Sequence, residues 1–155
     1  MGMGQLLDRL HGLFDSAFGS PEVVLADQHP APIDHRPTLL RIAAEALIRQ
    51  DEADDVLRSI RDRVPLGHVA PRGGPLVLRF FELRDLLPEH CDDPEQERLR
   101  GMLSVILHNH AMLVSTAMDL AACEWRSERI ARQIDTLDGV GATGKALDEI
   151  YHRLR

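Results

Sequence analysis

The segment from Asp93 to Asp138 constrains the fold most, because after Pro94 it contains no proline and one glycine, Gly101. Asp93 can accept backbone N–H groups of a first helical turn, and Pro94 suits the first helical position. Residues on one helical face then recur at alternating spacings of four and three: Leu99, Leu103, Ile106, His110, Leu113, Ala117 and Leu120. The sequence therefore predicts an all-α helical bundle of four to five helices, with one long central helix over about 94–138.

The length of this helix conflicts with the size of the chain. A helix over 94–138 would span roughly 67 Å, whereas a compact domain of 155 residues has a diameter of about 40 Å. The helix must therefore break or project from the domain. Apolar residues become sparse after Trp125, so we expect 126–138 to form a projecting helical arm.

The whole chain, 1–155, is predicted to form a single helical domain. Met3–Phe18 has the pattern of an amphipathic helix, and 19–37 is a long connection that contains four prolines. An unbroken four–three pattern over 38–64 predicts a second long helix, although Asp51 could instead start a new one.

Further along the chain, two glycines and Pro71 predict a loop over 65–74. Pro75 then starts a helix to about Leu87, whose apolar residues cover most of its circumference and predict that it is well buried. A short helix that starts at about Thr143 completes the bundle.

Composition and charge argue against several classes of partner. The formal charge of −7 lacks the positive footprint that duplex nucleic acid or an anionic membrane requires, so we expect neither partner. No apolar segment reaches the ~18 residues of a membrane span.

The cysteines and the N-terminal residues bear on localisation. The two cysteines form no cluster. The N-terminal residues lack a basic stretch followed by a long apolar run, which is the pattern of a secretory signal. We therefore expect a cytoplasmic protein.

Two motifs resemble functional sites by their letters. The segment from Gly139 to Lys145 matches GxGxxG and also GxxxxGK, although Ala146 stands where the phosphate loop has Ser or Thr. Both nucleotide-binding motifs require a preceding strand and further parallel strands. A charged helix precedes these glycines, and only ten residues follow Lys145. The segment is better explained as a glycine turn with Thr143 as the N-cap of the next helix.

A histidine on the apolar face is the other candidate. His110 lies between Ile106 and Leu113, where a hydrogen-bonded core histidine is the common explanation and a metal or haem ligand the alternative. Glu149 and His152 have the ExxH spacing, but a dinuclear site requires two such motifs. Gln50 and Asn109 also lie on or beside apolar seams, where polar groups can fix the register of helix pairs.

These observations favour a non-catalytic helical-bundle interaction or regulatory protein that requires no cofactor. We expect a protein partner or a second copy as a homodimer, bound through an apolar strip on the arm: Trp125, Ile130, Ile134 and Leu137. The alternative function is a bundle that binds a small ligand or metal in its core at His110, as an enzyme or as a binding protein.

Overall fold

Five helices occur in residues 31–123 and 127–155, which are the residues that the computed structural model describes. They are α2 (Arg36–Arg61), α3 (Leu66–Asp85), α4 (Pro94–Ala122), α5 (Glu128–Asp135) and α6 (Ala142–Leu154). These ranges contain no strand, apart from one isolated bridge between Asp138 and Val140. The predicted all-α bundle with a long helix is confirmed. The predicted helix Met3–Phe18 lies outside the described residues.

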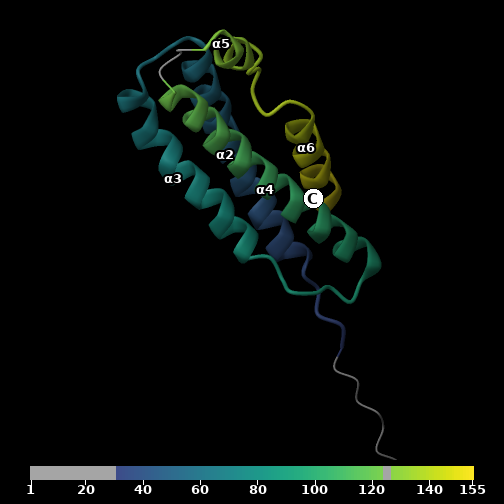
Figure 1. Ribbon diagram of the computed structural model, residues 1–155. Coiled ribbons are helices and arrows are strands. Elements are labelled where there is room, and N and C mark those ends of the chain that lie inside the picture. The colour runs from purple at the N-terminus through teal and green to yellow at the C-terminus, as the bar shows by residue number, and fades with distance from the viewer. Residues whose placement is uncertain (1–30, 124–126) are drawn as a thin grey trace, which may run out of the picture. The chain divides into compact units, whose positions relative to one another are not determined.

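The centre of the bundle is the pair α2 and α4, because α3, α5 and α6 each pack against both of them. Figure 1 shows α3 and α6 on opposite sides of this pair, with α5 at one end. In the described part of the chain α3 and α6 do not contact each other. A face of α4 consequently stays uncovered between them.

Helix α2 is continuous, as the unbroken periodicity predicts, and no new helix starts at Asp51. Its buried residues follow the predicted stripe from Leu39 to Ile60. The helix ends at Arg61 because Arg63 adopts a left-handed conformation with a φ of 63°. The N–H groups of Arg63 and Val64 then bond to the carbonyl groups of Ile60 and Ser59, which closes the last turn as a Schellman motif.

A polar cluster joins the starts of α2 and α4. The predicted N-cap is confirmed, since Asp93 Oδ1 accepts the N–H of Gln96 at 2.8 Å. The buried Gln96 side chain accepts the N–H of His35 at 2.9 Å and donates to Asp34 at 2.9 Å. Each polar atom of this buried amide is thereby tied to the residues that precede α2.

Helix α3 corrects the predicted loop at 65–74, because it begins at Leu66 and contains both Pro71 and Pro75. The two prolines are four residues apart and exposed, so they lie on the solvent side of the helix. The opposite side carries a regular buried stripe: Val69, Gly73, Leu76, Phe80 and Leu83. The expectation that this helix is buried on most sides is also wrong, since Leu78 is 63% exposed.

The end of α4 corrects the predicted extent of the central helix. It stops at Ala122, and a separate helix, α5, starts after Ser127, whose backbone is extended. Residues 127–138 do not project, because α5 packs against α2 and α4 and buries Ile134 completely. Arg63 and Asp135 form an ion pair at 2.8 Å that ties α5 to the end of α2. The conflict of length is therefore resolved by a break.

Substitution of Gly73 tests the close contact between α3 and α4. A Cβ atom at Gly73 would clash with the Sδ atom of Met118, whereas Gly74 has no heavy atom within 4 Å of its Cβ position. We expect Gly73→Val to lower the free energy of unfolding by about 1–3 kcal/mol through overpacking. Gly74→Ala should instead raise it by about 0.5–1 kcal/mol through helix propensity. Urea denaturation of both variants checks this, and equal effects would contradict the packing described.

Candidate functional site

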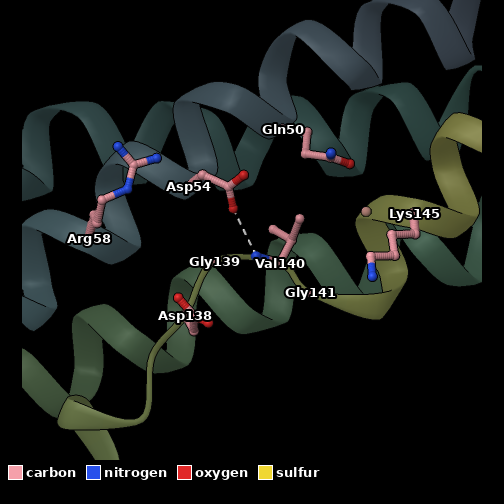
Figure 2. A pocket seen from close by; sticks show the side chains of 9 residues that line it. Gln50, Asp54, Arg58, Asp138, Gly139, Val140, Gly141 and Lys145 are labelled. Carbon is pink, nitrogen blue, oxygen red and sulfur yellow. Dashed lines mark hydrogen bonds between the residues drawn. The ribbon is translucent and has the colours of Figure 1, made fainter.

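The glycine turn before α6 forms a small surface pocket with α2. The pocket has a volume of about 250 Å³ and is lined by nine residues: Gln50, Asp54, Arg58, Asp138, Gly139, Val140, Gly141, Gly144 and Lys145. Figure 2 shows the Asp54 carboxylate directed from α2 to the turn, where it accepts the N–H of Val140 at 2.8 Å. This carboxylate therefore serves as an anchor for the turn.

Each glycine of the turn has a steric explanation within the chain. Gly139 and Gly141 have φ values of 71° and 58°, which side-chain-bearing residues rarely adopt. A Cβ atom at Gly144 would lie 2.8 Å from Val140 Cγ2 and 3.0 Å from Gln50 Nε2. Gly141, and not the predicted Thr143, is the N-cap of α6. The pattern that resembles a nucleotide-binding loop is thus accounted for by a tight joint between α5 and α6.

Substitution of Gly139 tests this joint, because a Cβ atom there would be strained and would clash with Asp54. We expect Gly139→Ala to lower the free energy of unfolding by about 2–3 kcal/mol, through left-handed strain and a weakened Asp54 hydrogen bond. In an Asp54→Ala background the same substitution should cost about 1 kcal/mol less. A double-mutant cycle by chemical denaturation measures the difference, and strictly additive effects would rule out the anchoring role of Asp54.

His110 lies where the sequence places it, on the buried face of α4 with 1% of its surface exposed. Its Nδ1 atom is 2.8 Å from the Ile106 carbonyl oxygen, and its Nε2 atom is 3.3 Å from Oε1 of Gln50 on α2. The ring also packs edge-on against Phe80, with ring centroids 5.3 Å apart. Both nitrogens therefore face groups of the protein itself.

The protonation state of His110 follows from these contacts. Burial lowers the pKa of His110 below its usual value, although the Ile106 hydrogen bond and the charge of Asp54 oppose this effect. The carbonyl can only accept, so the neutral ring carries its proton on Nδ1, and Nε2 is an acceptor. Nε2 accepts a hydrogen bond from Gln50 when the amide is oriented with its NH₂ group toward the ring. The pair thus joins α2 to α4 within the core.

The lowered pKa gives a pH dependence of stability with a definite sign. The unfolded chain binds a proton at His110 more readily than the folded chain, so stability is greatest above about pH 6.5 and falls as the pH decreases below it. His110→Leu should remove this part of the dependence, and His108→Leu, which replaces an exposed histidine of the same helix, should not. Denaturation between pH 5 and pH 8 compares the three proteins, and identical slopes would refute this assignment.

No group of three or more His, Cys, Asp or Glu side chains suited to a metal occurs in the described ranges. His108 lies at the surface beside Phe81 and Arg84, away from His110. His152 bonds through Nδ1 to its own helix, at the Asp148 carbonyl. Burial, followed by the charge of Glu97, raises the pKa of Cys91, so this thiol has little thiolate character.

The predicted interaction surface on the arm is largely turned into the bundle. Ile134 is fully buried, while Ile130 and Leu137 are partly buried against the core. Trp125 lies outside the described residues. The apolar positions of α5 therefore stabilise their own chain, and an exposed strip must be sought elsewhere.

The exposed face of α4 provides such a strip. Met102, Val105 and Met112 are 39%, 59% and 46% exposed, and with Asn109 they follow the same four–three rhythm as the core stripe. We call this set the outer stripe of α4, with Arg98 and Thr116 at its two ends. A groove of about 420 Å³ runs beside its first half: it is lined by Glu97, Arg98, Gly101, Met102, Val105, Ile106 and Ala146. The spacing of this stripe is visible in the sequence, but the interaction surface was predicted on the arm instead.

The outer stripe is uncharged between its ends, and the nearest acid is firmly paired. Glu97 accepts two hydrogen bonds from Arg100, at 2.6 and 2.8 Å, and one from the N–H of Cys91 at 2.9 Å. Arg100 first, and then Cys91, hold the pKa of Glu97 down to about 2. This carboxylate is bound to its own chain and is not free for catalysis.

Comparison of the chain with family models, with curated proteins and with solved structures finds no match. Within residues 31–123 and 127–155, none of the helices has the combination of length and apolar character needed to cross a bilayer.

Proposed function

We propose that the protein is a non-catalytic helical-bundle interaction protein that associates with a second copy of itself through the outer stripe of α4. The observation that carries this proposal is the exposure of Met102, Val105 and Met112 on one uncharged helix face. Burial of methionine and valine side chains is favourable because it removes apolar surface from water. Exposed apolar faces of this kind are typical of protein–protein contacts.

The distribution of ionisable groups supports a role without catalysis. Glu45 and Glu82 are both paired with Arg79, and Arg49 pairs with Glu52. Asp54 anchors a turn, and His110 is held by Ile106 and Gln50. An active site usually combines a pocket with titratable groups that are free to act on a substrate. Here Glu45 links α2 to α3, and Asp54 and His110 link α2 to other elements, whereas Glu52 and Glu82 pair with arginines of their own helices.

The alternative function, a ligand or metal bound at His110, receives less support. A histidine binds a metal through a ring nitrogen whose lone pair points at the ion, and its other ring N–H is commonly donated to a carbonyl. The Nδ1 atom of His110 faces a carbonyl oxygen, so a metal would have to bind Nε2, and that atom faces the amide of Gln50. A ligand there would have to displace Gln50 and separate α2 from α4.

We further propose that the protein acts in the cytoplasm. The support is the state of its two cysteines, since Cys91 and Cys123 are both free thiols. Free cysteines are typical of reducing compartments.

A charged substitution in the outer stripe tests self-association, with a matched control on α3. Val105 and Leu78 are 59% and 63% exposed, so glutamate at either position should leave the fold intact. We expect the wild type to show a mass above that of the monomer at high concentration in light scattering. Val105→Glu should remove this association, because a carboxylate would be buried in the contact, whereas Leu78→Glu should not.

Circular dichroism of both variants serves as the control for folding. A wild type that stays monomeric at every concentration would refute the proposed function. Equal loss of association in the two variants would show that the contact does not involve the outer stripe.

A further inference from the structure

We infer that two copies pair through α4 in an antiparallel orientation, about a two-fold axis at the level of Leu107; this inference rests on the proposed self-association. The first observation is the symmetry of the outer stripe. Arg98 and Thr116, Met102 and Met112, and Val105 and Asn109 lie at equal distances on either side of position 107. In an antiparallel pair each residue therefore faces the other member of its pair from the second copy. Met102 then contacts Met112 at two symmetry-related places.

The groove on α4 provides the second observation. Four of its lining residues, Arg98, Gly101, Met102 and Val105, are spaced as the four sides of a hole on a helix surface. In the antiparallel register the side chain that faces this hole is Met112 of the second copy. A methionine is unbranched and flexible, so it fits irregular holes well.

Gly101 is the third observation, because nothing in its own chain explains it. A glycine inside a helix costs about 1 kcal/mol relative to alanine. Gly101 has ordinary helical φ, and its Cβ position has no heavy atom within 4 Å. Gly73 and Gly144 are each required by a close neighbour in the bundle, whereas Gly67 and Gly74 on α3 are as open as Gly101 but do not line this groove. The empty space at Gly101 is the floor of the groove, and a second chain would use it.

The charges at the ends of the stripe select the antiparallel orientation. Arg98 and Asp119 are exposed, on the same side of α4, and neither has an ion-pair partner among the described residues. In the antiparallel pair Arg98 of each copy lies within a helical turn of Asp119 of the other. A parallel pair would bring Arg98 next to Arg98 and Asp119 next to Asp119. Electrostatic complementarity of this kind fixes orientation more than it adds affinity.

Filling the hole provides the first test. Gly101→Leu would occupy the space meant for Met112 of the second copy, and the monomer has room for it. Gly74→Leu is the matched control, since Gly74 also has an open Cβ position but lies on α3. We expect Gly101→Leu to weaken self-association at least tenfold in sedimentation measurements, while Gly74→Leu has no effect. Thermal melting should show that both variants remain folded.

Charge reversal tests the orientation. Arg98→Asp and Asp119→Arg should each weaken self-association several-fold, because each places like charges together at both ends of the pair. The double variant should regain the association of the wild type. An equimolar mixture of the two single variants should also associate more tightly than either alone, since the two copies then carry opposite charges at both ends.

The outcomes separate this inference from the proposed function. If the wild type associates and Val105→Glu abolishes association, but Gly101→Leu and the charge reversals have no effect, the antiparallel pairing is wrong and the proposed function stands. If the wild type is monomeric throughout, both are wrong. Rescue by the double variant and by the mixture, together with loss in Gly101→Leu, supports the pairing as described.

Discussion

The contact between α2 and α4 is the constraint on which the other helices depend, because α3, α5 and α6 each pack against both members of this pair. Small buried residues, among them Ala43 and Ala46 on α2 and Ala111 on α4, contribute little bulk to the core. The Gln50–His110 contact and the Gln96 cluster add polar links, at the middle and at one end of the pair. Polar groups buried in this way are satisfied in one relative position of the two helices, so they favour a single register.

Hydrophobic periodicity and capping residues predicted α2 and the start of α4 correctly. The four–three stripe of α2 and the Asp93 cap of α4 were both readable from the sequence and are present in the structure. The prediction was wrong at 65–74 because Pro71, Gly73 and Gly74 were taken as loop residues and Pro75 as the start of the helix. Pro71 and Pro75 both lie on the exposed side of α3, where a missing backbone N–H does not disturb the buried stripe.

The end of α4 was predicted incorrectly for a different reason. Local propensity between Asp93 and Asp138 is helical almost throughout, and it contains little information about where a long helix must fold back. A helix of roughly 67 Å must break or project from a domain of about 40 Å, and its length alone does not decide between the two. The break is favoured because it lets α5 return to α2 and α4 and bury Ile134, a gain that depends on tertiary contacts.

Hydrophobic periodicity alone does not identify the candidate site on α4. Helix α4 carries two apolar stripes with the same rhythm, one in the core and one on the surface, and a period alone does not say which is covered. One polar residue on each stripe distinguishes the buried stripe from the exposed one. His110 on the core stripe is matched by Gln50 of the same chain. Asn109 on the outer stripe is exposed and has no side-chain hydrogen bond among the described residues.

In the antiparallel pair proposed above, Asn109 lies near the two-fold axis, where it faces Val105 of the second copy and is about one helical turn from Asn109 of that copy. A polar residue at such a seam costs some stability and in return restricts the register of helix pairing. His110 and Asn109 would then perform the same task in two places: one fixes how α4 packs inside the chain, and the other fixes how it packs against a second chain.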